Sequence, residues 1–181
     1  MPAVNDMKKS SKITLCAICS ALSFVIAMLG HIPVINYSAA AIAGLFVMIP
    51  LVEISIPYAF ATYITSAVLI GLFGEIETKI LFILLFGFYP VIKAIVEKIS
   101  NHIIEWILKL AIFTGSITLA YFLMKYLLNI DVDNFGPLGK YGVVIFLVLS
   151  YVAFVLYDVA ISRISMFYFI RIRPHLSGIK K

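Results

Sequence analysis

The stretch SAAAIAGLFVMIPLVEISIPYAFATYITSAVLIGLF, from Ser38 to Phe73, is 36 residues long and contains a single charged residue. As one helix rising 1.5 Å per residue it would be about 54 Å long, nearly twice the ~30 Å hydrocarbon core of a bilayer. Pro50 and Pro57 flank its middle, and a proline removes a backbone donor from a helix. The stretch therefore predicts a tight hairpin of two membrane-crossing helices, near 38–52 and 56–73.

Four more apolar runs are long enough to cross a bilayer as helices. Polar segments separate them, and the alternating pattern of a membrane β-barrel does not occur. The 181-residue chain is therefore predicted to be all-α, a single transmembrane domain formed by a polytopic bundle of six helices. The four further helices are expected near 13–30, 80–96, 106–128 and 143–165, and a basic tail follows at 166–181.

The composition also indicates a membrane protein. Of its residues 63% are hydrophobic and only 13% are charged, with a mean hydropathy of +1.10. A soluble domain has about 25% charged residues. Six crossings use nearly the whole chain, so no soluble catalytic domain is expected. The net charge of +5 comes from lysines and arginines beside the apolar runs, which favours lipid headgroups over nucleic acid as their partner.

The lysines and arginines divide unequally between the two sides of six alternating crossings. If the N-terminus is inside, eleven lie on the cytoplasmic side and three, Lys79, Lys125 and Lys140, lie outside. Cytoplasmic segments of membrane proteins carry such an excess. We therefore expect a multi-pass membrane protein with both termini in the cytoplasm.

Motifs of the common membrane enzymes and ATPases are missing. The sequence has no G-x-x-x-x-G-K-[ST] run and no H-E-x-x-H, which argues against a P-loop ATPase and a zinc protease. Cys16 and Cys19 form C-x-x-C within the first apolar run without a second ligand pair, and are predicted to be small packing residues. We expect no enzymatic activity, no bound metal and no cofactor.

Polar and aromatic side chains recur at helical spacing within the apolar runs. A charge at the centre of a bilayer costs roughly 2.5 kcal/mol or more, so these stripes are expected to face the bundle interior. One stripe on the fifth helix contains Thr114, Thr118 and Tyr121. Lys93 and Asp158, toward the cytoplasmic side, are predicted to form a structural ion pair between the fourth and sixth helices.

The outer third of the bundle gathers aromatic planes with a few hydrogen-bond donors, which suit a small, flat, partly polar ligand. An interfacial aromatic belt with a snorkelling lysine is the alternative interpretation. Pro90 is predicted to kink the fourth helix near mid-membrane and to free the carbonyl of Phe86, as in the broken helices of many transporters or in a purely structural kink. The candidate ligand-binding residues are His31, Asn36, Tyr37, Phe86, Tyr121, Lys125, Ser150 and Tyr151.

Small residues define one face of the first helix. Ala17-x-x-x-Ala21 would let another helix approach closely. That helix could belong to another protein, or it could be the chain's own second helix, which is itself rich in alanine and glycine.

The basic N-terminus runs directly into Lys12-Ile-Thr-Leu-Cys-Ala-Ile-Cys-Ser-Ala-Leu-Ser23, which contains the Ala17/Ala21 pair. Together with the length and the six helices, this resembles the substrate-binding S component of an energy-coupling factor (ECF) transporter. The segment Gly87-Phe-Tyr-Pro-Val-Ile-Lys93 is similar to uncharacterised members of that group.

The resemblance implies capture of a vitamin-like micronutrient at the outer face, under the first loop. It also implies docking through Ala17 and Ala21 onto a separate membrane T component that carries two ATPases, which fits the missing P-loop. Family sites draw on the first loop and the outer halves of helices four to six. Tyr89 lies in the same zone as the other candidate residues by its depth, not by a matched motif, and is added to them. No signature of the thiamine, riboflavin, biotin or folate members is recognised.

Two other functions remain open at this point. A scaffold of the rod-shape-determining MreD type would use the same small-residue faces and bind no ligand. A small membrane enzyme would use Lys93 and Asp158 as a catalytic pair, but their cytoplasmic depth and the lack of a third group argue against it.

Overall fold

The structure is a computed structural model that describes residues 8–32, 34–99, 101–123, 125 and 142–172. Its regular elements are helices, with no strand among the described residues. Six helical segments in the described part are long and apolar enough to cross a membrane, which points to a multi-pass membrane protein. Residues 129–141, which belong to the segment between the fifth and sixth predicted helices, and the part of the tail beyond 172 lie outside the described residues.

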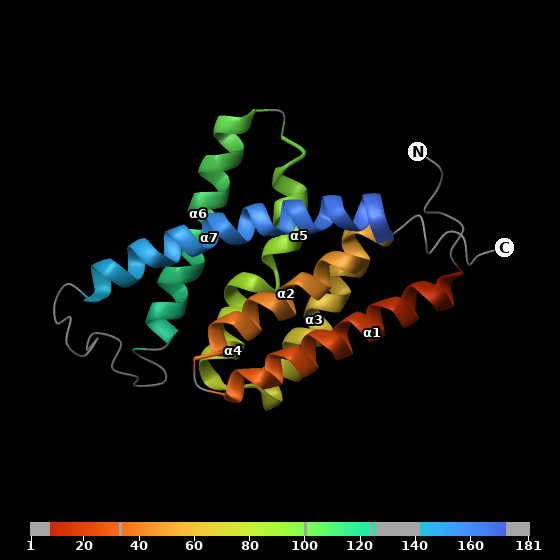
Figure 1. Cartoon of the computed structure of the whole chain (residues 1–181), viewed down its shortest axis with the longest axis horizontal. Coiled ribbons are helices and arrows are strands. Elements are labelled where there is room, and N and C mark those ends of the chain that lie inside the picture. Colours follow the sequence, from red (N-terminus) through yellow and green to blue (C-terminus); the bar gives the residue numbers. More distant parts are fainter. Residues whose placement is uncertain (1–7, 33, 100, 124, 126–141, 173–181) are drawn as a thin grey trace. The chain divides into compact units, whose positions relative to one another are not determined.

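The chain divides into two compact units, Met1–Leu123 and Met124–Lys181. The helices of the first unit follow one another with short connections (Figure 1). They are α1 (Lys9–Met28), the short η2 (Leu29–His31), α2 (Asn36–Glu53), α3 (Ile56–Phe73), α4 (Ile76–Leu81), η3 (Phe82–Phe86), α5 (Tyr89–Val96) and α6 (His102–Phe122).

Three helices begin about four residues earlier than the apolar runs that predicted them: α1, α6 and α4, which begins at Ile76 rather than near residue 80. α1 begins at Lys9 rather than near residue 13, because lysine and serine allow helix to continue out of the bilayer. α6 begins at His102 rather than near residue 106, because the Asn101 side chain caps it and accepts a hydrogen bond from the Ile103 N–H at 3.0 Å. Apolar length predicts the membrane span, whereas residues outside it decide where the helix starts, by helix propensity in α1 and by side-chain capping in α6.

The predicted break in the long apolar stretch lies between Glu53, where α2 ends, and Ile56, where α3 begins. Ser55 between them is extended, and Pro57 occupies the first turn of α3. Pro50 lies within the last turn of α2, where its carbonyl accepts the N–H groups of Ile54 and Ser55 at 2.9 and 3.2 Å. The prolines thus flank the turn.

Hydroxyl groups join α1 to its two neighbours. The Ser23 hydroxyl donates to the carbonyl of Ala43 in α2 at 2.9 Å, and the Ser20 hydroxyl donates to the carbonyl of Thr62 in α3 at 3.3 Å. Ser20 and Ser23 are buried, and the alanine-rich side of α2 packs here. In a bilayer, where apolar contact alone does not drive association, small residues and interhelical hydrogen bonds hold helices together.

The fourth span is interrupted by a π-helical turn, η3, between α4 and α5. The Gly87 N–H donates to the Phe82 carbonyl, five residues back, at 2.8 Å. Pro90 lies in the first turn of α5 and lacks the N–H that would continue a regular ladder, which accounts for the irregular turn just before it. The Tyr63 hydroxyl on α3 donates to the Ile83 carbonyl at 2.8 Å and so satisfies a backbone acceptor within the π turn.

Gly87→Ala is expected to lower the free energy of unfolding by about 1–3 kcal/mol, the usual cost of overpacking a core. A Cβ at this position would lie 2.8 Å from two ring atoms of Phe82 and 2.8 Å from its carbonyl oxygen, and Phe82 is fully buried. Unfolding by sodium dodecyl sulfate in mixed micelles measures the loss. Gly115→Ala is the matched control, because a Cβ there meets nothing within 4 Å. Equal stability of the two variants would contradict the packing at the π turn.

The second unit contains α7 (Gly142–Phe167) and a final π turn, η6 (Tyr168–Ile172). The sequence predicted this helix, α7, near 143–165. Within α7 the Ser162 hydroxyl donates to the backbone carbonyl of Asp158 at 3.2 Å. The guanidinium of Arg171 lies 5.9 Å from the centre of the Phe167 ring, a cation–π arrangement at the end of the helix.

Candidate functional site

Five polar residues gather where the first loop meets α4, and we call them the loop cluster: Asn36, Tyr37, Glu75, Glu77 and Thr78. The Asn36 side-chain amide donates to a carboxylate oxygen of Glu77, and its own oxygen accepts the Tyr37 N–H at 2.9 Å. The half-exposed Tyr37 side chain also interacts with Glu77. The start of α2 and the start of α4 are thereby joined through one carboxylate.

The two glutamates of the loop cluster have different tasks. The Glu75 carboxylate caps α4 and accepts the backbone N–H groups of Glu77 and Thr78 at 2.9 and 3.1 Å. An acidic cap suits the positive end of a helix dipole. Because Glu75 satisfies the helix end, the Glu77 carboxylate is directed toward Asn36 and Tyr37 instead.

Close packing fixes the loop against α4. Gly30 is buried, and a Cβ there would overlap the hydroxyl of Thr78 and lie 3.0 Å from its Cβ and Cγ2. Val34 in the loop adopts a left-handed backbone conformation, with φ 79°, and is 88% exposed. A β-branched residue rarely takes this conformation, and such strain tends to occur at functional positions.

The predicted ligand-binding residues are placed unevenly. Asn36 and Tyr37 belong to the loop cluster, whereas the exposed His31 lies before it, with Nδ1 3.0 Å from the Met28 carbonyl oxygen. Phe86 packs against the apolar core, and Tyr89 is only 1% exposed.

The remaining predicted ligand residues lie farther along the chain. Tyr121 is half-buried near the end of α6, with its ring centre 6.0 Å from that of Phe122. Lys125, Ser150 and Tyr151 belong to the second unit, and their participation in the site stays a prediction.

Glu77 is the residue in contact with Asn36 and Tyr37 that was not predicted from the sequence. Its neighbours Glu75 and Thr78 in the loop cluster were not predicted either. The signal available for Glu77 was its position two residues after Glu75, at the start of a helix: the first acid of such a pair caps the helix, which leaves the second free for other contacts.

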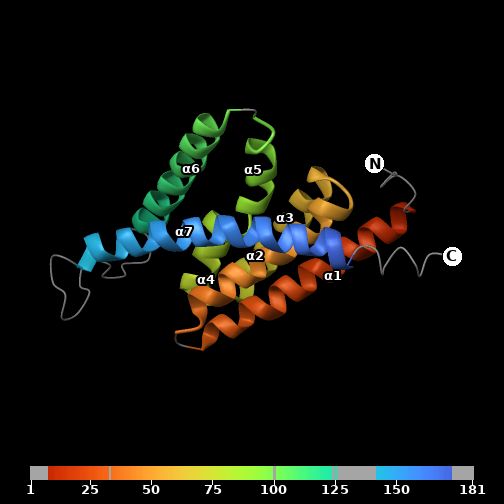
Figure 2. The ribbon, with the colours of Figure 1, turned by 45° about the horizontal axis from the view of Figure 1, so that its top comes forward.

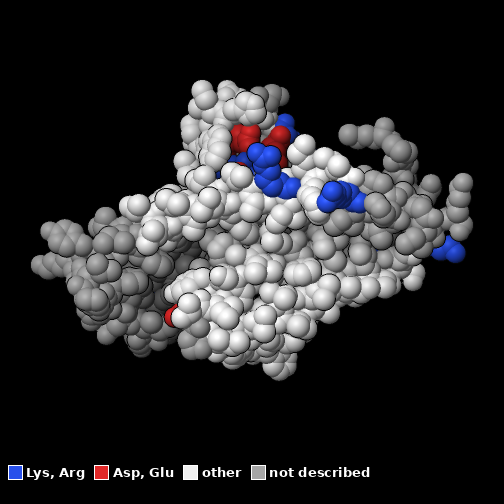
Figure 3. Space-filling model, in the orientation of Figure 1, with Lys and Arg blue, Asp and Glu red and all other residues white. Residues whose placement is uncertain are grey.

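A second group of charges lies where α5 meets α6, and we call it the ion-pair cluster: Lys93, Glu97, His102, Glu105 and Lys109. One oxygen of Glu97, Oε1, lies 2.9 Å from the Lys93 ammonium and 3.2 Å from that of Lys109. Lys109 is also 2.7 Å from Glu105, whose other oxygen lies 3.3 Å from His102 Nδ1. Figure 3 shows acidic atoms exposed in this region on a largely uncharged surface.

Lys93 and Lys109 are 3% and 2% exposed, so their charges depend on partners rather than on water. The sequence predicted Asp158 as the partner of Lys93, whereas the ion pair described is with Glu97, four residues along the same helix. Asp158 lies in the second unit, and its pairing with Lys93 stays a prediction.

Ala17 and Ala21 are exposed, while Cys19, Ser20 and Ser23 on the other side of α1 are buried. Since α2 and α3 bind α1 through these buried residues, the chain's own second helix does not fill the Ala17/Ala21 face. The face remains available to another helix or to lipid.

The loop cluster can accept and donate hydrogen bonds and carries negative charge, which equips it to hold a small polar solute. No family model, curated protein or solved structure matches the chain.

Proposed function

We propose that the chain is the substrate-binding S component of an ECF-type importer, which captures a vitamin-like micronutrient at the outer face of the bacterial plasma membrane. The loop cluster carries this proposal. Asn36, Tyr37 and Glu77 are brought together at the loop end of apolar helices, where such groups make no favourable contact with lipid chains. They offer a solute one carboxylate, one amide and one phenol.

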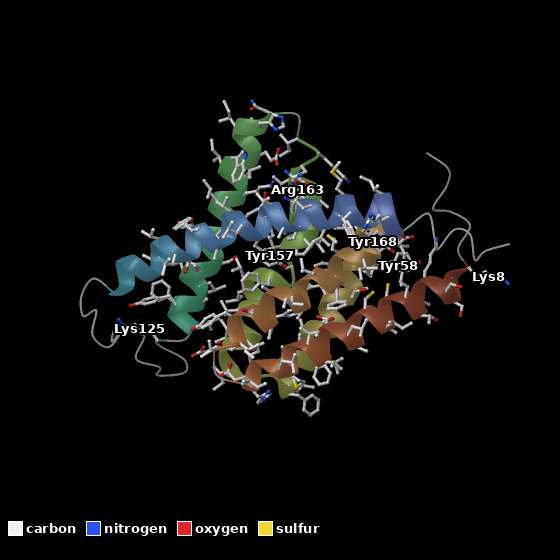
Figure 4. The ribbon with its side chains drawn as sticks, viewed as in Figure 1. Lys8, Tyr58, Lys125, Tyr157, Arg163 and Tyr168 are labelled. Atoms are coloured by element: carbon white, nitrogen blue, oxygen red, sulfur yellow. The ribbon has the colours of Figure 1, made fainter. Side chains whose placement is uncertain are left out.

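The opposite end of α1 supports the orientation in this proposal. Lys8, labelled in Figure 4, precedes the helix, and Lys9 and Lys12 lie in its first turns without an acidic neighbour there. Lysines at this end oppose the helix dipole, so anionic headgroups and the positive-inside preference explain them better than helix stability does. The N-terminus would then be cytoplasmic and the loop cluster external.

The exposed Ala17/Ala21 face supports docking to a T component. A face of two alanines one turn apart admits a partner helix at short distance. The T component and two separate ATPase subunits would supply the energy that this chain, without a P-loop, does not.

An MreD-type scaffold without a ligand is the second candidate. The observation that favours it is the packing of Phe86 and Tyr89 into the interior, where their rings fill space that a ligand would otherwise occupy.

Native mass spectrometry of the protein purified from its own membrane separates the two functions. The importer predicts a co-purified small molecule at near-equimolar amount and complexes with two ATPase subunits. The scaffold predicts neither, and a preparation free of both would end the transport proposal.

Glu77→Gln is expected to reduce the amount of co-purified ligand at least about tenfold, because a hydrogen bond to a charged group is worth about 1.5–3 kcal/mol. The change keeps the shape of the side chain and one acceptor for Asn36. Native mass spectrometry reports the ligand per protein. Glu75→Gln is the matched control: it weakens the α4 cap by roughly 1 kcal/mol and should retain ligand. Full ligand retention by Glu77→Gln would remove this residue from the site.

A further inference from the structure

A narrow stripe of side chains packs the helix α6 against the rest of the first unit. Its buried residues, Glu105, Lys109, Phe113 and Ala120, recur at helical spacing, and it packs chiefly against α5 and η3. The two charged members come first and the two apolar members follow. Figures 1 and 2 show α5 and α6 joined by a short connector and leaning apart as they leave it.

The ionic part of this stripe contains a contact between the two helices. Glu97 lies at the end of α5. Its Oε1 oxygen forms ion pairs with the ammonium of Lys93 on the same helix and with the ammonium of Lys109 on α6. Lys109 lies seven residues into α6, about 10 Å along the helix. Its ammonium is buried and has Glu105, at 2.7 Å on its own helix, as a second acidic partner. Separation of α6 from α5 leaves Glu105 in place and breaks the contact with Glu97, one of the two acidic partners of this buried charge.

We propose that the Glu97–Lys109 contact is an ionic latch that sets the angle between α5 and α6. Tyr121 lies twelve residues beyond Lys109, about 18 Å along the helix, so a 10° rotation at the latch moves it by about 3 Å. The latch thus controls the position of the far end of α6 from the opposite side of the bilayer. The consequence for ligand binding rests on the proposed function, whereas the latch itself does not.

The members of the latch differ in accessibility. The Lys109 side chain is buried, whereas the Glu97 side chain is 42% exposed. Glu97 is therefore the member of the latch that is accessible from outside the bundle.

Pulsed electron paramagnetic resonance on the full chain in lipid nanodiscs, without any ligand, tests the latch. Nitroxides are attached at Ile95→Cys and Ile104→Cys, both exposed, to report the α5–α6 angle near the connector. A second pair, Leu72→Cys on α3 and Leu119→Cys on α6, reports the far end. The native cysteines are first replaced by Cys16→Ala and Cys19→Ala.

Glu97→Gln and Lys109→Met are each expected to broaden both distance distributions, with a shift of several ångströms for the pair at Leu72 and Leu119. Lys98→Gln is the control: it changes one charge at an exposed position next to Glu97, and the distances should stay as in the native chain. Lys109→Met introduces an apolar side chain that favours insertion, so it serves if Glu97→Gln does not fold. Native-width distributions in a folded variant would overturn the latch, while absence of a bound ligand would affect only the proposed function.

Discussion

Ala17→Trp and Ala21→Trp, made separately, are expected to abolish assembly with the T component and to reduce substrate uptake about 10- to 100-fold. Both alanines are exposed on α1, so an indole there meets no part of α2 or α3 and the chain should still insert and fold. A partner helix that approaches closely over two alanines has no room for an indole. Co-purification of the ATPase subunits measures assembly, and uptake in cells measures function.

Leu22→Trp is the matched control for this experiment. Leu22 is also exposed on α1 and follows Ala21 directly, which turns its side chain about 100° around the helix. The same indole is added to the same helix, but it points toward lipid, and assembly should persist. If both alanine variants assemble and transport as the native chain does, docking through this face is wrong.

The helices could be predicted from sequence because their signals are local. The length of each apolar run predicts a span, and Pro50 and Pro57 mark the turn between α2 and α3. The π turn before Pro90 was predicted only as a kink, because the proline shows that a backbone bond is lost but not how the chain compensates. Part of this compensation is the hydrogen bond from the Tyr63 hydroxyl, on another helix, to the Ile83 carbonyl within the π turn.

The partners within the sites were harder to predict, since periodicity identifies a face but not what lies opposite. The polar stripe on the fifth helix illustrates this: Thr114 and Thr118 are exposed rather than interior. The Thr114 hydroxyl donates to the Leu110 carbonyl of its own helix at 2.7 Å, so its donor is satisfied within α6. Asn36 and Tyr37 were placed near the outer site by depth alone, and only three-dimensional packing brings Glu77 to them.

Gly30→Ala is expected to lower the free energy of unfolding by about 2–3 kcal/mol, at the upper end of overpacking effects, and to cause loss of the co-purified ligand. The added methyl group would overlap the Thr78 hydroxyl, and Thr78 is fully buried. Its backbone N–H is held by Glu75 and its hydroxyl lies 3.5 Å from the Asn36 carbonyl oxygen, so the clash must displace the loop from α4. Unfolding in mixed micelles and native mass spectrometry measure the two effects.

Thr78→Ala in the Gly30→Ala background tests whether the clash with Thr78 causes the loss of stability and of ligand. It removes the hydroxyl and Cγ2 and leaves only the Cβ, 3.0 Å away, so it should restore more than about 1 kcal/mol beyond the sum of the single effects. A double variant as unstable as the sum of the singles would show that Gly30 and Thr78 are not in contact. Glycine has no side chain with which to bind a solute. Any loss of ligand in Gly30→Ala that the second change restores must therefore act through the position of the loop cluster.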